Sequence, residues 1–241
     1  MQIEVITIFP EMFPGVFGSS ILKRAQDAGH LRVRVYDLRD YSRDKHRKVD
    51  DRPYGGGPGM VLRVEPIASA IEAVKAHRCA SHAGAPAAAC RTLLLSPQGP
   101  RLSPERAQEL AGLRHLLLVC GHYEGVDERV KAIIDGAISI GDYVLTGGEL
   151  PAMVVIDCLA RFIPGVIGHE QATVEESFAG GGLEYPQYTR PPVFRDMEVP
   201  PILLSGDHER IAAWRQQQSV ARTLAARPDL VVKNGSERRS T

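Results

Sequence analysis

Two short segments that are apolar at their centres constrain the fold most: RTLLLSP (91–97) and HLLLVCG (115–121). A strand with apolar residues on both sides must be buried on both faces, which is typical of the central strands of parallel sheets. Segments 3–9, 31–38 and 137–145 are further expected strands. The sequence therefore predicts a mostly parallel α/β sheet that helices cover on both faces.

Helical segments lie between these strands. We expect helices over residues 13–28, 65–76, 103–109, 127–134 and 150–162. Ser103 followed by Pro104 is a clear start signal, because serine caps the first free N–H groups of a helix and proline suits its first position.

The regular pattern dissolves between Pro164 and Pro192, where three consecutive glycines and several prolines occur. This composition is typical of a linker. Beyond it, the segment 205–230 has the pattern of a helix. We predict three parts: a main domain over 1–167, a flexible linker over 168–192 and a small helical domain over 193–241.

The composition of the 241 residues excludes several classes of protein. With 44% hydrophobic residues, the chain has enough apolar material to build a core. The 29 basic and 29 acidic residues cancel, so a nucleic acid would have to bind a local basic patch. No apolar run reaches a membrane-spanning length, and the four cysteines form no C-x-x-C pair. We therefore expect a cytoplasmic protein with reduced thiols and no membrane partner.

Three predicted strands end in segments rich in glycine and small residues: 93–100, 116–127 and 138–151. Ligands of parallel α/β sheets bind at the carboxyl ends of the strands, where glycines let the backbone approach the ligand. Together the segments favour one pocket for an adenine or a similar heterocycle, although each alone is also compatible with an ordinary tight turn.

Common nucleotide and hydrolase motifs are missing. GGGPGM (55–60) lacks the lysine of a P-loop, and neither G-x-G-x-x-G after a strand nor G-x-S-x-G is present. The histidines are scattered, so we expect no metal site.

Two charged segments have both a plain and a functional interpretation. The basic stretch 43–52 is compatible with a solvated loop, or with contacts to a phosphate backbone that Arg190 and Arg215 would extend. Glu175 and Glu176 are compatible with two solvated acids, or with a general base on a loop that becomes ordered when substrate binds.

A series of longer motifs resembles one known family. In chain order the motifs are DDRPYGGGPGM (50–60), LSPQG (95–99), CGHYEGVDERV (120–130), SIGDYVLTGGELPAM (139–153), RFIPGVIG (161–168), LEYPQYTRP (183–191) and EVPPILLSGDH (198–208). They occur in this order in bacterial tRNA (guanine-37-N1)-methyltransferases of the TrmD type. The resemblance runs from Ile3 to about Leu230, which is nearly the whole chain.

The resemblance implies a SPOUT fold, an α/β domain with a deep trefoil knot, followed by a small helical C-terminal domain. It also implies that S-adenosylmethionine (SAM) binds in the knot. The residues that match the family's SAM site are Leu95, Ser96, Pro97, Gly121, Tyr123, Gly125, Ile140, Gly141, Asp142, Tyr143, Val144, Leu145, Gly147, Gly148 and Pro151. This set agrees with the pocket expected from the three glycine-bearing segments.

The implied reaction is methylation, on N1, of the guanine 3′ of the anticodon in tRNA. Glu176 stands where the family has an aspartate as general base, so the extra methylene could shift the geometry by about an ångström; Glu175 stays a rival. Arg161 matches an arginine that stabilises negative charge on guanine O6. We expect substrate contacts at Asp50, Gly59, Glu124, Arg190 and Arg215.

The resemblance further implies a homodimer in which the base and SAM come from different protomers. It also implies a dependence on Mg²⁺, for which the sequence shows no ligand set. Gly180 stands where the family has a second acid, which adds a glycine to the linker. Two other functions stay open. A SPOUT 2′-O-ribose methyltransferase is disfavoured by GGGPGM and DYVLTGGELPAM, and SAM binding would distinguish a non-catalytic RNA-binding SPOUT protein.

Overall fold

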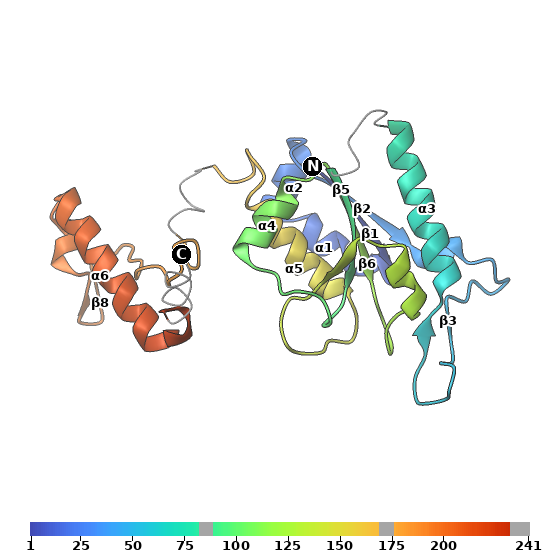
Figure 1. Cartoon of the computed structure of the whole chain (residues 1–241). Coiled ribbons are helices and arrows are strands. Elements are labelled where there is room, and N and C mark those ends of the chain that lie inside the picture. Colours follow the sequence, from blue (N-terminus) through green and yellow to red (C-terminus); the bar gives the residue numbers. More distant parts are fainter. Residues whose placement is uncertain (82–88, 169–175, 232–241) are drawn as a thin grey trace, which may run out of the picture. The chain divides into compact units, whose positions relative to one another are not determined.

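The computed structural model describes residues 1–81, 89–168 and 176–231 (Figure 1). The chain divides into two compact units, 1–168 and 169–241, and each is described here by itself. The end of the first unit lies next to the domain boundary predicted at 167. The further division into a linker and a C-terminal domain stays a prediction.

The first unit is built on a five-stranded sheet of order β2-β1-β6-β5-β7, in which all neighbours pair in parallel. Its strands are β1 (Gln2–Thr7), β2 (Arg32–Asp37), β5 (Cys90–Leu95), β6 (His115–Cys120) and β7 (Gly136–Ile138). β6 lies at the centre, and every one of its residues is buried. The predicted parallel sheet is therefore confirmed, and its order places β6, β5 and β7 side by side.

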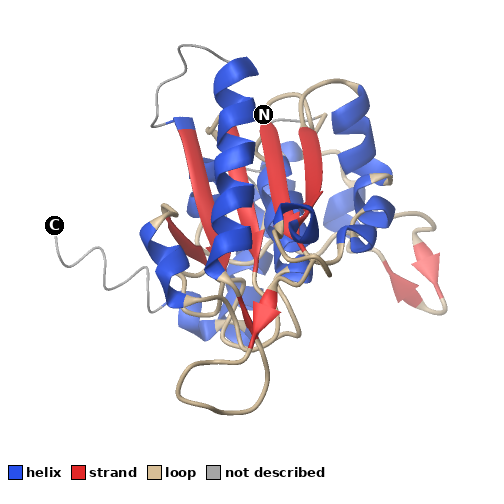
Figure 2. Cartoon of the chain, turned by 90° about the vertical axis from the view of Figure 1, so that its right-hand side faces the viewer, coloured by secondary structure: helices blue, strands red, loops and turns tan. Residues whose placement is uncertain are grey.

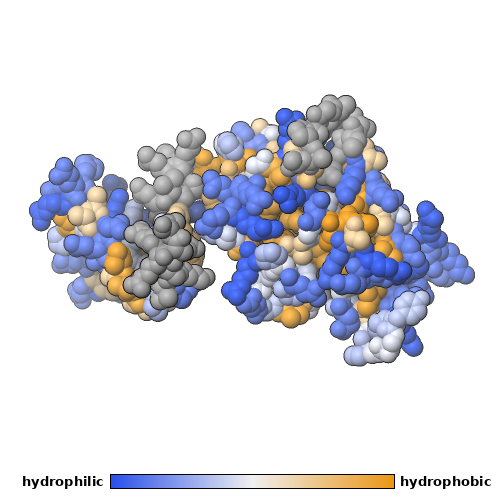
Figure 3. Space-filling model, in the orientation of Figure 1, coloured by the Kyte–Doolittle hydropathy of each residue, from blue (hydrophilic) through white to orange (hydrophobic). Residues whose placement is uncertain are grey.

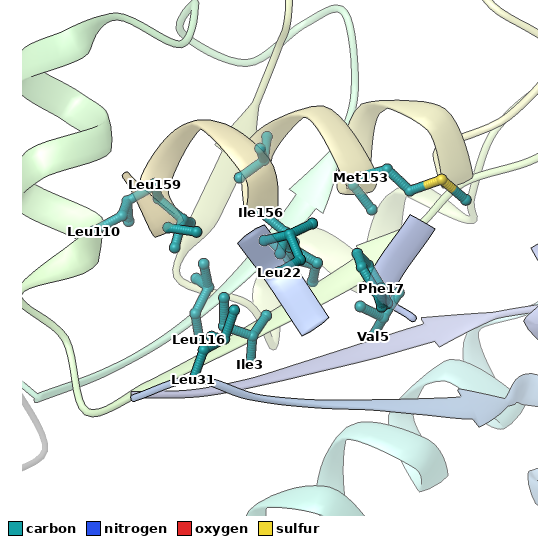
Figure 4. Close-up of a cluster of buried hydrophobic side chains, with 14 of the residues drawn as sticks. Ile3, Val5, Phe17, Leu22, Leu31, Leu110, Leu116, Met153, Ile156 and Leu159 are labelled. Carbon is teal, nitrogen blue, oxygen red and sulfur yellow. The ribbon is translucent and has the colours of Figure 1, made fainter. Parts of the chain in front are cut away.

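Helices cover both faces of this sheet (Figures 1 and 2). The helices of this unit are α1 (Pro14–Phe17), α2 (Ser20–Asp27), α3 (Val64–Ser81), α4 (Pro104–Ala111) and α5 (Glu149–Ala160). On one face, α5 packs with α1, α2 and α4 over β1 and β6, and the labelled side chains of these elements point toward one another (Figure 4). On the other face, Ile67 and Ile71 of α3 pack with Ile6 of β1. Burial of these two apolar layers is the main source of stability.

Residues 13–28 do not form the single helix predicted from the sequence. The first helix, α1, ends at Gly18, where an added Cβ would lie 2.7 Å from the carbonyl oxygen of Pro14. Ser20 then has a φ of 49°, in the left-handed region that cannot continue a right-handed helix. The segment is therefore two short helices joined by a tight bend.

The elements predicted over 127–134 and 137–145 are shorter than expected. The first is a helical turn over Glu128–Ala132, capped by Asp127, and hydrogen bonds from Arg129 lower the pKa of this aspartate to about 2. The second strand ends at Ile138, where β7 ends. The Ser139 hydroxyl then accepts a hydrogen bond from the Gly141 N–H (3.1 Å), and the chain turns away from the sheet.

The second unit contains a hairpin of β8 (Val193–Phe194) and β9 (Met197–Glu198), and the helix α6 (His208–Ala226). Asp207 caps α6 by accepting from the Arg210 N–H (3.1 Å). Part of the predicted linker packs on this helix. The Leu183 N–H donates to Thr223 Oγ1 (2.9 Å), and the Ser219 hydroxyl donates to the Leu183 carbonyl (2.6 Å). These bonds tie the segment around Leu183 to α6.

Two further expectations concern topology and membranes. The trefoil knot implied by the resemblance stays a prediction. In the part of the chain that the structure describes, no helix combines the length and the apolar character needed to cross a bilayer.

Candidate functional site

Three loops meet at the carboxyl edge of the sheet, because the strands that precede them, β6, β5 and β7, are neighbours (Figure 2). Backbone hydrogen bonds join the loops to one another. The Ser96 N–H donates to the Ile138 carbonyl (3.0 Å), which connects the ends of β5 and β7. The Gly148 N–H donates to the Gly121 carbonyl (2.7 Å), which connects the start of α5 to the end of β6. The three predicted strand ends thus form one site.

The loops enclose a cavity of about 300 Å³. Every predicted SAM residue except Asp142 lines it: Leu95, Ser96, Pro97, Gly121, Tyr123, Gly125, Ile140, Gly141, Tyr143, Val144, Leu145, Gly147, Gly148 and Pro151. Asp142 instead pairs with Arg101, with 2.5 Å between Oδ2 and Nη2. The structure brings the lining residues together around a space within the usual range for small-molecule sites.

Two glycines allow the loops to approach closely. A Cβ on Gly99 would lie 2.5 Å from the backbone nitrogen of Ile138. A Cβ on Gly148 would lie 2.7 Å from Cα of Cys120. Both distances are too short for carbon beside backbone atoms, so close packing of the loop backbones requires glycine at these two positions.

A short hairpin lies against the loop that follows β6. It is formed by β3 (Asp50–Asp51) and β4 (Val61–Leu62), and a glycine-rich loop connects the two strands (Figure 1). The tip of this loop is pale in Figure 3, since glycine, proline and tyrosine have intermediate hydropathy. The Glu124 N–H donates to the Met60 carbonyl (3.0 Å), and a Cβ on Gly59 would lie 2.6 Å from Cγ of Glu124. The predicted substrate residues Gly59 and Glu124 are therefore in contact, and Asp50 lies at the base of the same hairpin.

Three residues that the sequence interpretation did not single out form a polar group at the cavity: Thr7 and Glu149 are buried, and His122, whose side chain is 18% exposed, lines the cavity. The Thr7 hydroxyl donates to Glu149 Oε1 (2.7 Å), and Glu149 Oε2 lies 3.6 Å from His122 Nδ1. Burial, together with the nearby Glu149 carboxylate, raises the pKa of the Cys120 thiol, so this cysteine is not a nucleophile. One sequence signal was available: Glu149 opens a largely apolar helix, and a buried acid needs a partner.

The predicted catalytic arginine, Arg161, is the exposed C-terminal cap of α5. The basic stretch 43–52 is partly used in ion pairs, since Arg47 pairs with Asp40 and lies 3.6 Å from Asp37. Other basic side chains of this stretch, including Lys45, are exposed. Contacts of the basic stretch with a phosphate backbone stay a prediction.

In the second unit, the predicted substrate residues Arg190 and Arg215 line one cavity of about 440 Å³. The Arg215 guanidinium lies over the Tyr185 ring, 4.6 Å from its centroid. Aromatic rings and guanidinium planes are the groups on which proteins stack unpaired bases. Glu176 belongs to this unit, and the rival base Glu175 lies outside the described residues.

Within residues 1–81, 89–168 and 176–231, the side chains that commonly bind metals form no cluster. No group of three histidine, cysteine, aspartate or glutamate side chains there could hold a metal ion. The implied Mg²⁺ dependence therefore stays a prediction, and no step below depends on it.

Comparison with known proteins gives consistent matches over nearly the whole chain. A family model described as "tRNA (Guanine-1)-methyltransferase TrmD" matches residues 1–233. The chain is 54% identical over 234 residues to a tRNA (guanine-N(1)-)-methyltransferase of Moorella thermoacetica, covering 97% of this chain and 91% of the relative. It is 53% identical over 233 residues to the protein of that name from Dictyoglomus turgidum, with the same coverage. A relative of the same name from Geobacillus kaustophilus is 53% identical over 232 residues, covering 96% of this chain and 91% of the relative.

Proposed function

Because the chain belongs to the tRNA (guanine-1)-methyltransferase TrmD family, we propose that it transfers the methyl group of SAM to N1 of guanine 37 in tRNA. The observation that carries the proposal is the cavity at the ends of β5, β6 and β7, which the predicted SAM residues line. Transfer of a methyl group and a guanine of tRNA as its acceptor are both stated in the names of the family and of the relatives at 50% identity or more.

The residues of the cavity fit SAM. Its lining is mostly backbone, glycine and small or apolar side chains, which suits an adenine ring and a thioether-like chain. SAM supplies a methyl group bound to a positively charged sulfur. Glu124 and Glu128 are the acidic residues of the lining. Glu128 pairs with Lys131 (2.6 Å), which also lines the cavity, so Glu124 is the carboxylate that supplies negative charge near the cationic donor.

In the proposed step, a bond forms between guanine N1 and the methyl carbon while the bond from carbon to sulfur breaks. The electron pair of that bond goes to sulfur, which becomes a neutral thioether. The N1 proton goes to the carboxylate of Glu176, the proposed general base. Arg161 stabilises the negative charge that develops on guanine O6 as the proton leaves. Asp50, Gly59, Glu124, Arg190 and Arg215 are the proposed contacts with the RNA.

We propose that the enzyme is a cytoplasmic homodimer, with SAM held by one protomer and Glu176 supplied by the other. Exposed apolar residues of α5 support the dimer, since Leu150 is 50% and Val154 is 46% exposed. Exposed large apolar side chains on the outer face of a helix are typical of an interface between subunits. This helix also ends at Arg161, so a partner packed on it would lie near a catalytic residue.

Methyl transfer from labelled SAM to unmodified tRNA transcripts tests the proposed function. A transcript with guanine at position 37 should gain label as 1-methylguanosine, identified by the mass of the nucleoside. A matched transcript with adenine at that position should gain none. Label in both transcripts, or label on a ribose oxygen, would contradict the proposed reaction.

Filling the cavity tests the SAM site. A Cβ on Gly121 would make only ordinary contacts, 3.7 Å from the Leu95 carbonyl oxygen and from Val126 Cγ1, which both belong to the lining. Gly121→Leu should therefore occupy the cavity without straining the backbone. Overpacking costs about 1–3 kcal/mol, so we expect SAM binding to weaken by about five- to 150-fold. Calorimetric titration measures this loss, and Gly121→Ala, the matched control, should bind close to wild type. Unchanged binding to the leucine variant would place SAM elsewhere.

A further inference from the structure

The polar group of Thr7, His122 and Glu149 has no assigned role in the proposed reaction, yet His122 lines the cavity. The Glu149 side chain is 2% exposed. A carboxylate buried this deeply is unfavourable unless it is hydrogen-bonded. The Thr7 hydroxyl supplies that bond at 2.7 Å and accepts one from the Phe9 N–H at 3.0 Å. Glu149 is also the first residue of α5, where the helix dipole favours a negative charge.

The second carboxylate oxygen of Glu149 faces the His122 ring. His122 Nδ1 lies 3.6 Å from it, and this nitrogen is shielded from solvent and makes no hydrogen bond with the described residues. The imidazole is held by two further aromatic rings. The Phe9 centroid is 5.0 Å away, and the Tyr123 centroid is 4.8 Å away in an edge-to-face arrangement.

A glycine makes this approach possible. A Cβ on Gly147 would overlap both Nδ1 of His122 and Oε2 of Glu149. His122 and Gly147 are also backbone neighbours in an isolated bridge. The loop that precedes α5 is therefore shaped to let the carboxylate reach the imidazole.

The residue after His122 is held in an uncommon conformation. Tyr123 has a φ of 58°, which is left-handed and costs free energy for a side chain other than glycine. Such conformations persist where the surrounding structure holds them, and they cluster at functional sites. Glu124 follows directly, lines the cavity and contacts Gly59.

We propose that Glu149 is a positioning residue for methyl transfer. Anchored by Thr7, it holds the His122 imidazole, and through it keeps Tyr123 and Glu124 oriented toward the cavity. Glu149 touches neither SAM nor guanine in this role. The inference rests on the proposed function, because the orientation it maintains is that of residues assigned to SAM and RNA.

Two substitutions that preserve shape test this role. Glu149→Gln keeps an acceptor for Thr7 but removes the charge that faces the imidazole. His122→Phe keeps a ring but removes Nδ1. We expect each to lower kcat/KM for methyl transfer by about 10- to 100-fold, as the loss of a supporting contact does at other sites. The double variant should be no worse than the poorer single one, because both remove the same contact. His122→Asn, whose amide can donate toward Glu149 from near the position of Nδ1, should recover part of the activity.

The controls separate positioning from stability. Glu72→Gln changes an exposed acid in the interior of α3 and should leave activity and melting temperature unchanged. Activity of Glu149→Gln within twofold of wild type, or additive effects in the double variant, would overturn the proposal. A variant that does not fold is replaced by the pair Thr7→Val and Thr7→Ser, of which only the valine variant should lose activity.

The same variants distinguish failure of this inference from failure of the proposed function. If the wild-type protein methylates no tRNA, the proposed function fails. The Kd for SAM then becomes the readout, because Tyr123 lines the cavity. Weaker SAM binding by Glu149→Gln and His122→Phe, without additivity, would support positioning, and unchanged binding would overturn it.

Discussion

Glu176→Gln is expected to lower the rate of methyl transfer by about 100- to 10,000-fold, the usual contribution of a general base. The amide has nearly the shape of the carboxylate but cannot take the N1 proton of guanine. SAM affinity should stay at the wild-type value, because all the residues that line the cavity belong to the first unit. Single-turnover transfer and calorimetric SAM titration measure the two quantities on the same protein.

Two further glutamine variants complete this experiment. Glu175→Gln tests the rival base, and Glu209→Gln changes an exposed acid in the first turn of α6 as a matched control. Both should retain activity near wild type. An inactive Glu175→Gln beside an active Glu176→Gln would move the general base by one residue.

The turn that follows Glu176 affects how this glutamate is positioned as a general base. The resemblance implies a second acid where this chain has Gly180, and a hydrogen bond closes the local turn. The Phe178 N–H donates to the Gly182 carbonyl (2.6 Å), and a Cβ on Gly182 would lie 3.0 Å from Thr223 Oγ1. This turn, which lies in the predicted linker, therefore makes close contact with α6.

The sheet could be predicted because its central strands are apolar on both sides, a pattern that few other structures tolerate. The bend that divides residues 13–28 into two helices could not be predicted. Ser20 has a φ of 49°, a left-handed conformation that its residue type does not signal. Ile140, Tyr143 and Val144 have strand-like side chains, but the turn at Ser139 and Gly141 removes them from the sheet.

The cavity could be predicted for a similar reason, since its glycines follow strands whose ends meet in any parallel sheet. The polar group of Thr7, His122 and Glu149 could not be predicted, because its members are far apart in the chain. Thr7 and Glu149 are separated by 142 positions. Only the packing of α5 beside the end of β1 shows that they share a hydrogen bond.

Two variants, one inactive at low SAM concentration and one lacking the base, should restore activity when they share one dimer. Gly121→Leu has a blocked cavity but an intact Glu176, and Glu176→Gln has an open cavity but no base. If SAM and the base come from different protomers, a heterodimer has one site with both an open cavity and a carboxylate. Its second site lacks both. The heterodimer should therefore show about half the activity of the wild-type dimer, since a two-fold symmetric dimer has two equivalent sites.

Coexpression with two affinity tags isolates this heterodimer, and the assay is run with SAM well below its Kd for Gly121→Leu. The matched control pairs Gly121→Leu with the double variant Gly121→Leu/Glu176→Gln, which leaves no open cavity and should stay inactive. If each site is contained in one protomer, the heterodimer should be inactive. One of its chains then lacks the open cavity and the other lacks the Glu176 carboxylate. An inactive heterodimer that is folded and dimeric would thus place SAM and Glu176 in the same protomer.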